Sequence, residues 1–169
     1  MRLGGRFHVL FRKYQRCNWR IKEMTSIDQI FWMLSWDRDA KTQQEGIREA
    51  QQIKYLSVLF RPIPIQPMEC KSVWENCAKV IASKSDETLE RFVLEMFEWL
   101  QDINHPGAEL IYNRLLEMPL ERIAYSFQAS LKKSKALNDV SWVRCLLAFK
   151  QEYELLHQQS IIPPENTEC

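Results

Sequence analysis

Apolar side chains recur at helical spacing through most of this chain. The spacing is clearest after Ser26, where Ile27, Ile30, Phe31 and Leu34 follow at three- and four-residue intervals behind a residue suited to cap a helix. The same pattern returns between polar turns as far as residue 157. It predicts seven helices, over residues 27–36, 40–60, 71–83, 87–101, 106–118, 120–133 and 140–157.

Residues 61–67 interrupt this pattern, because Pro62, Pro64 and Pro67 forbid a helix and favour an extended connector. The chain has only 4 glycines, too few for the many tight turns of a sheet protein of this size. We therefore expect an all-α fold. Segments 33–37 and 98–102 share a Trp and an Asp, and each precedes a glycine, Gly46 or Gly107. This weak repeat favours an α-α superhelix of HEAT/armadillo-like helical hairpins, with an irregular helical bundle as the alternative.

The stretch from 98 to 117 is the centre of this pattern. It predicts the end of one helix, a polar turn and the start of a second helix at Pro106, because proline is favoured at the first position of a helix. Asp102 or Asn104 would then cap the second helix. The stretch is therefore interpreted as the hinge of a helical hairpin.

Charge divides the 169-residue chain into regions. Residues 1–23 carry seven basic side chains against Glu23 alone, whereas the rest of the chain has an excess of acids. The basic segment could be an arm for an acidic partner, a helix packed on the body, or sequence upstream of a start at Met24, which we favour. We expect one helical domain over residues 24–157 and a polar, disordered tail over 158–169. No apolar run is long enough for a membrane span, and the acidic body makes nucleic acid an unfavoured partner.

The candidate functional residues are polar or aromatic and lie near two tryptophans. They are Trp74, Glu75, Asn76, Trp99, Asp102, Asn104 and Arg114. Trp and Arg are frequent in binding hot spots, so these residues could form a recognition surface at one edge of the hairpins. In the alternative, structural interpretation, which we favour, the tryptophans fill the core, Asp102 or Asn104 caps a helix, and Arg114 pairs with a carboxylate in a turn.

No catalytic motif is present, so we do not expect an enzyme. His8, His105 and His157 are scattered, and His105 beside Asp102 is interpreted as an exposed turn residue rather than as an acid–base pair. The five cysteines have no metal-ligand spacing, so we expect no metal site and no cofactor. We expect reduced thiols in a cytoplasmic protein, with Cys77 and Cys145 in the core.

Two motifs carry a resemblance to a known family. They are Trp-Glu-Asn-Cys-Ala-Lys at 74–79 and Trp-Leu-Gln-Asp-Ile-Asn-His-Pro-Gly-Ala at 99–108. Over about residues 71–118 the chain resembles a small bacterial family known as domain of unknown function 5071, although an aromatic residue often stands there where this chain has His105. The resemblance implies an all-helical fold similar to HEAT and armadillo repeats, with no established activity.

These observations favour a protein–protein interaction module. Some bacterial helical-repeat proteins of this size are immunity proteins that block toxin domains, so an immunity protein is one form that the module could take. The alternative is a helical-repeat nucleic-acid-binding protein or enzyme, with the basic segment 1–23 supplying phosphate contacts.

Overall fold

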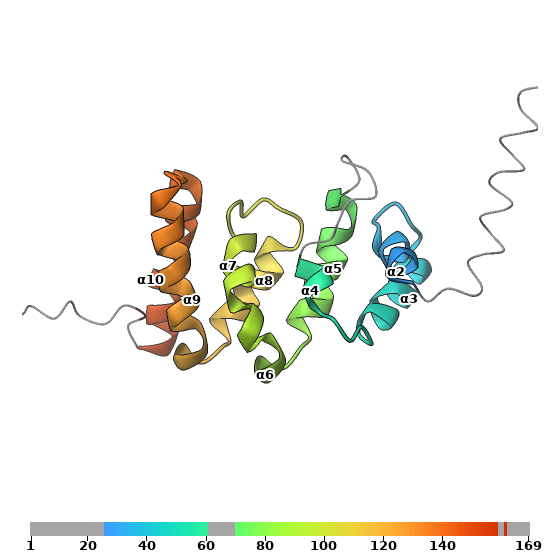
Figure 1. Cartoon of the computed structure of the whole chain (residues 1–169), viewed down its shortest axis with the longest axis horizontal. Coiled ribbons are helices and arrows are strands. Elements are labelled where there is room, and N and C mark those ends of the chain that lie inside the picture. Colours follow the sequence, from blue (N-terminus) through green and yellow to red (C-terminus); the bar gives the residue numbers. More distant parts are fainter. Residues whose placement is uncertain (1–25, 61–69, 159–160, 162–169) are drawn as a thin grey trace, which may run out of the picture.

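The computed structural model describes residues 26–60, 70–158 and 161, and every regular element in these ranges is a helix. The α-helices follow one another in pairs along a row, from α2 at one end to α10 at the other (Figure 1). The longer ones are α2 (Ile27–Leu34), α3 (Ala40–Ala50), α5 (Trp74–Ala82), α7 (Val93–Trp99), α8 (Ala108–Leu116), α9 (Leu120–Ala136) and α10 (Val140–His157). The shorter ones are α4 (Ser57–Phe60) and α6 (Asp86–Leu89).

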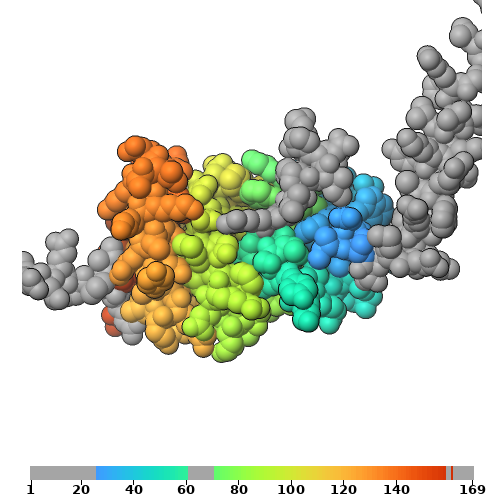
Figure 2. All heavy atoms as spheres, viewed as in Figure 1, coloured from blue at the N-terminus to red at the C-terminus, as the bar shows by residue number. Residues whose placement is uncertain are grey.

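Contacts between the pairs arrange the helices in two layers. On one side, α3 packs against α5, α5 against α8, and α8 against α10. On the other side, α4 packs against α7, and α7 against α9. Side chains of adjacent pairs touch along the whole row, as Figure 2 shows. The prediction of an all-α fold is therefore confirmed for the described residues.

Side chains cap three of the predicted helices. The Ser26 Oγ accepts a hydrogen bond from the Gln29 N–H at 3.3 Å, and Asp39 accepts one from the Thr42 N–H at 3.1 Å. Asp139 accepts a bond from the Trp142 N–H at 3.0 Å at the start of α10. Each cap satisfies a backbone donor that the first turn of the helix leaves free, which is why these short-range signals predicted the helix starts correctly.

The predicted helix over residues 40–60 is wrong in its second half, because α3 ends at Ala50. A turn follows, and the short helix α4 then places Leu59 in the core with no exposed surface. The Lys84 ammonium donates a hydrogen bond to the Gln51 carbonyl at 2.7 Å, which satisfies one carbonyl left free where α3 stops.

The predicted helix over residues 87–101 is also interrupted. It consists of α6, a 3₁₀ turn over Glu90–Phe92, and α7, which begins at Val93. Phe92 lies at the junction, and its ring stacks on that of Phe60 at a centroid distance of 4.9 Å. The bend lets Leu89 and Phe92 both be buried, although no proline or glycine marks it in the sequence.

The largest buried side chains join α7, α9 and α10. The Phe97 ring lies 5.6 Å from that of Phe127 and 5.2 Å from that of Phe149, and both contacts are edge to face. The Trp142 indole donates a hydrogen bond to the Phe97 carbonyl at 3.0 Å. These contacts hold α9 and α10 against α7. No helix in the described ranges is both long and apolar enough to cross a membrane.

Both ends of the chain were given boundaries in the sequence analysis. The basic segment 1–23 lies outside the described residues, as does most of the expected tail over 158–169. Ile161 is described, and its side chain is buried, with its N–H donating a hydrogen bond to the Glu154 carboxylate at 3.2 Å. At this residue the chain is therefore attached to α10 rather than free.

Candidate functional site

The loop between α7 and α8 carries the polar residues that the sequence singled out. The Asp102 carboxylate accepts hydrogen bonds from the Asn104 N–H at 2.9 Å and from the Asn104 side-chain amide at 3.0 Å. These bonds hold the pKa of Asp102 below its usual range, because they favour the charged form. The structure thus brings Asp102 and Asn104 together, and they bond to each other within the loop.

Neither of these residues caps α8, so the predicted cap is wrong. The helix begins at Ala108, and its N-terminal cap is Gly107, which makes no side-chain hydrogen bond. Gly107 has a φ of 78°, a left-handed conformation that costs other residues free energy. A Cβ there would lie 2.4 Å from the Ala78 Cβ and 3.1 Å from the Trp74 carbonyl oxygen. Only glycine lets the loop rest on α5 in this way.

The two glycines that suggested a repeat occupy different places. Gly46 lies inside α3, and a Cβ there would come within 2.7 Å of the Met33 Cβ on α2, the other helix of its own pair. Gly107 lies in a loop and contacts α5, a helix of the preceding pair. Both mark a close approach, but they are not equivalent positions, so their spacing is no evidence of a repeat.

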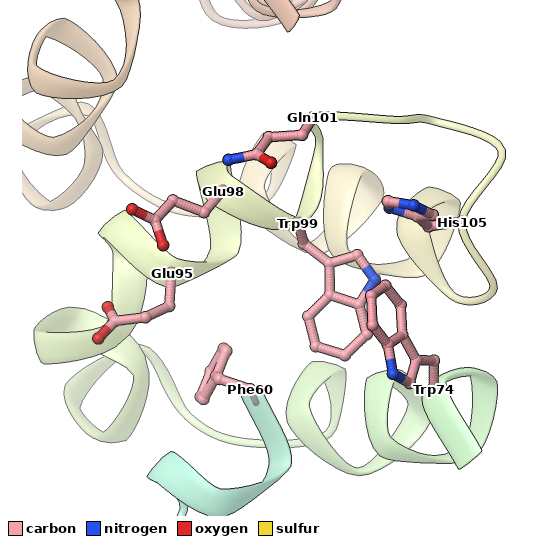
Figure 3. Close-up of a pocket in the computed structure, with 7 residues that line it drawn as sticks. All are labelled: Phe60, Trp74, Glu95, Glu98, Trp99, Gln101 and His105. Carbon is pink, nitrogen blue, oxygen red and sulfur yellow. The ribbon is translucent and has the colours of Figure 1, made fainter. Parts of the chain in front are cut away.

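An aromatic pocket of about 180 Å³ lies on one side of this loop. Its lining residues are Phe60, Trp74, Glu95, Glu98, Trp99, Gln101 and His105, drawn in Figure 3. The Trp74 and Trp99 rings meet edge to face at a centroid distance of 5.5 Å. Trp99 is largely buried, and its indole donates a hydrogen bond to the Pro106 carbonyl at 3.3 Å. Two of the predicted residues therefore form adjoining walls of one pocket.

His105 was expected to be an exposed turn residue, and this expectation is wrong. Its side chain is only 21% exposed, and its ring packs against Trp74 at a centroid distance of 5.0 Å. Its Nε2 lies 3.7 Å from the Asp102 carboxylate. His105 thus links the aromatic pocket to the polar side of the loop.

A wider groove of about 830 Å³ lies on the other side of the loop, between the loop, α8 and α10. Asp102, Ile103 and Asn104 line it from the loop, and Ile103 is 46% exposed. The other lining residues include Glu109, Tyr112, Asn113, Arg144, Cys145 and Glu152. Three of the described lining residues, Asp102, Glu109 and Glu152, are carboxylates, and Arg144 is the only cation among them. The groove is therefore acidic, with an apolar side chain at its edge.

Tyr112 lies in this groove with a fixed orientation. Its hydroxyl donates a hydrogen bond to the Glu152 carboxylate at 2.7 Å, and its ring meets that of Phe149 edge to face at 5.4 Å. The pKa of Tyr112 is raised far above its usual value, mainly by partial burial and to a smaller extent by the bond to Glu152. The phenol therefore stays protonated at physiological pH and acts as a rigid amphipathic surface rather than as a base.

Asn76 does not belong to either pocket. It is 2% exposed, and its amide donates hydrogen bonds to the Leu34 carbonyl at 2.7 Å and to the Gln43 side chain at 2.8 Å. Its oxygen accepts a bond from the Lys79 ammonium at 3.0 Å. Asn76 thus ties α5 to α2 and α3. The neighbouring Glu75 only faces Lys79 on the surface of α5, at 3.9 Å.

Arg114 is also separate from the other candidates. It lies near the C-terminal end of α8, about 10 Å along the helix axis from Gly107. Its guanidinium pairs with the Asp86 carboxylate and donates a hydrogen bond to the Lys84 carbonyl at 3.1 Å. Arg114 therefore pairs with a carboxylate, as expected, but this carboxylate belongs to the first residue of α6 and not to a turn. The structure therefore does not bring the seven candidate residues together into one surface.

Two thiols are described in full, and neither is arranged as a nucleophile. Burial raises the pKa of the Cys77 thiol to about 12, so it behaves as a small apolar core residue, as the sequence predicted. Cys145 is half-buried beside the acidic groove, and burial raises its pKa as well. Within the described ranges, no group of three or more His, Cys, Asp or Glu side chains could hold a metal ion.

Several residues of the two pockets were not predicted from the sequence. Phe60 and Glu95 line the aromatic pocket, while Ile103 and Tyr112 line the acidic groove. Ile103 carried a signal that could have been used, because it is an apolar residue inside an otherwise polar turn. The others lie on helices where an aromatic or a carboxylate is ordinary, so only the packing of the helices identifies them.

The comparisons with known proteins assign a family. The family model named Domain of unknown function (DUF5071) matches residues 75–163, which is more than half of the chain. The chain belongs to this family. The match covers α5 to α10, including the loop and both pockets except Phe60 and Trp74, and it confirms the resemblance seen in the two tryptophan motifs. The search of curated proteins and the search of solved structures gave no match.

Proposed function

We propose that this DUF5071 protein is a protein-binding module that holds its partner in the acidic groove between the loop, α8 and α10. The supporting observation is the composition of that groove. It combines an exposed aliphatic side chain, Ile103, with an oriented tyrosine, Tyr112, and an excess of carboxylates. Tyrosine and buried aliphatic anchors contribute strongly to protein interfaces, and the carboxylates favour a partner segment with basic residues.

The arrangement of the helices supports the same proposal. Successive pairs lie side by side in a row, and the layer formed by α3, α5, α8 and α10 is continuous from one pair to the next (Figure 1). We infer that the chain is an α-α superhelix of the HEAT/armadillo type, a class that uses extended surfaces between repeats to bind proteins. An immunity protein, with a toxin domain as its partner, would be one form of such a module, and the acidic charge of residues 24–169 is compatible with a basic toxin surface.

The test is to purify the partner with the immobilised full-length chain and to measure its affinity for two groove variants. Ile103→Asp places a charge on the apolar edge, and Glu109→Lys reverses a charge in the groove. Each should weaken binding at least tenfold, the size expected when an interface anchor worth about 1.4 kcal/mol is lost. Leu94→Asp is the matched control, because Leu94 is an exposed aliphatic residue on α7 outside the groove.

The outcomes separate this proposal from its alternatives. A partner that binds the Leu94→Asp chain normally and both groove variants weakly supports it. Recovery of no stoichiometric partner at low salt, or equal affinity for all variants, contradicts it. Salt-dependent binding of DNA or RNA that is lost when residues 1–23 are deleted would instead favour the nucleic-acid alternative.

A further inference from the structure

The aromatic pocket differs in chemistry from the acidic groove. Three aromatic side chains line it at steep angles to one another, with 67° between Trp74 and Trp99 and 77° between Phe60 and Trp99. Glu95 and Glu98 line the same pocket from α7, both on the side opposite His105 in Figure 3. Aromatic walls with carboxylates at the edge are the surroundings that favour an organic cation, since the ring faces carry negative potential.

The two carboxylates at the pocket also favour a cation. Glu98 pairs with Lys133, so much of its charge is already balanced. Glu95 is half-buried, and no described residue forms a hydrogen bond or an ion pair with it. This carboxylate therefore lacks the balancing charge that a half-buried acid usually has. A cation in the pocket would supply it.

We propose that the aromatic pocket binds an alkylated ammonium group. The volume of about 180 Å³ is below the range of pockets that enclose drug-sized ligands, but it suits a group as small as trimethylammonium. An alkylated ammonium is more weakly hydrated than a bare one, so it loses less hydration free energy on entering a pocket lined in part by the Trp74, Trp99 and Phe60 rings. The group could belong to a free small molecule or to a methylated lysine side chain of a protein.

The first experiment separates charge from shape. The full-length chain is titrated with choline and with 3,3-dimethylbutan-1-ol, the neutral analogue in which carbon replaces the ammonium nitrogen, at matched ionic strength. Binding is followed through the indole N–H resonances in NMR spectra, with Trp74→Phe and Trp99→Phe identifying the two signals among the 6 tryptophans. We expect saturable shifts of these two signals with choline only, with a Kd of about 1 mM.

The second experiment locates the site. Glu95→Gln keeps the shape of the side chain and removes its charge, and it should weaken choline binding about fivefold, the equivalent of about 1 kcal/mol. Glu109→Gln is the matched control, because it removes one carboxylate from the acidic groove on the other side of the loop. It should leave choline binding unchanged, whereas Glu95→Gln should leave the protein partner of the groove bound.

A peptide that carries trimethyllysine distinguishes the two sources of the cation. Tighter binding of this peptide than of choline, with an unmodified lysine peptide bound weakly, assigns the pocket to a protein side chain. Choline binding without any gain from the peptide assigns it to a small molecule. No saturable response to either cation, or an equal response to the neutral analogue, overturns the proposal. Because the pocket and the groove share only Gln101, neither result depends on the function proposed for the groove.

Discussion

The two ends of helix α8 use their polar side chains for different purposes. At the C-terminal end, Arg114 is 11% exposed and binds Asp86 and the Lys84 carbonyl in the turn before α6. At the N-terminal end, Asp102 and Asn104 bond to each other within the loop and remain exposed. The polar side chain at the C-terminal end joins α8 to α6, whereas the polar side chains at the N-terminal end remain accessible to a binding partner.

What fixes the loop end is therefore backbone and aromatic packing rather than charge. Gly107 lets the chain rest on α5, and the Trp99 indole bonds to the Pro106 carbonyl. Residue type alone therefore does not distinguish a structural role from an available surface. Arg114, Asp102 and Asn104 are equally polar in the sequence, but only the two loop residues face a groove that could receive a partner. Substitutions at the two ends of α8 should separate these roles.

The largest effect at the loop end should come from Gly107→Ala. The change forces a left-handed φ on alanine and places its Cβ 2.4 Å from the Ala78 Cβ. We expect the free energy of unfolding in urea to fall by about 3 kcal/mol, combining the conformational cost with that of overpacking. Gly46→Ala is the control, because its Cβ also meets a neighbour, at 2.7 Å, but in a helical backbone.

The control should lose less stability than Gly107→Ala, because alanine regains about 1 kcal/mol of helix propensity at position 46. Equal losses of stability in the two variants would show that the left-handed backbone at position 107 adds nothing to the cost of placing alanine there. A Gly107→Ala protein as stable as the wild type would mean that the loop does not rest on α5, and the aromatic pocket would then lose its support.

At the other end of α8, Arg114→Ala should destabilise the fold by about 2 kcal/mol, because it leaves the partly buried Asp86 carboxylate without its cation. Urea unfolding checks the value, and a double-mutant cycle with Asp86→Ala isolates the coupling between the two side chains. Arg144→Ala is the matched control, because no described residue pairs with this exposed arginine in the acidic groove. It should change stability by less than about 0.5 kcal/mol.

Similar losses for Arg114→Ala and Arg144→Ala would contradict the comparison between the two ends. The arginines differ chiefly in burial and in partners, so their difference measures what the ion pair to Asp86 contributes. A loss of partner binding by Arg144→Ala without loss of stability would agree with the groove as an interface. The same loss by Arg114→Ala should appear only as far as the fold itself is weakened.

The sequence predicted what depends on near neighbours. The caps at Ser26, Asp39 and Asp139 each bond three residues ahead, so a local pattern was enough to find the helix starts. The breaks in the predicted helices 40–60 and 87–101 depend on distant contacts. Lys84 satisfies the Gln51 carbonyl, and Phe60 stacks on Phe92. Nothing in a window of the sequence reports such contacts.

The candidate site was also predicted only in part, because its residues come together through distant contacts. The sequence identified Trp74 and Trp99, which do share a pocket, because two tryptophans near polar turns are conspicuous. It also grouped Asn76 with them, although this residue bonds to Leu34, which lies 42 positions earlier in the chain. Glu95 and Phe60 were missed because each is ordinary on its own element. Only the stacking of helix pairs makes them neighbours of the tryptophans.

The smallest effect should come from Asp102→Asn, which keeps an acceptor oxygen for the Asn104 N–H but removes the charge. The pKa of Asp102 is lowered in the folded protein, chiefly by its hydrogen bonds to Asn104. Because the pKa is lower in the folded state, the carboxylate stabilises the fold at pH values above its ordinary pKa of 3.8. This contribution is lost as the pH falls through the folded-state pKa. The wild type should therefore have a slightly higher Tm than Asp102→Asn at neutral pH, and the difference should vanish in acid.

Thermal unfolding followed by circular dichroism from neutral to strongly acidic pH measures this difference directly. Asp39→Asn provides a reference, because hydrogen bonds to Thr42 lower the pKa of Asp39 as well, but at the cap of α3 and far from the loop. The reference should lose more stability at neutral pH, because asparagine still caps α3 but removes the second acceptor, which binds the Thr42 hydroxyl at 2.6 Å, and the negative charge at the helix N-terminus. A loss at Asp102 as large as at Asp39 would mean that the loop carboxylate has a structural duty equal to a cap. The polar surface at this end of α8 would then serve the fold first, as Arg114 does at the other end.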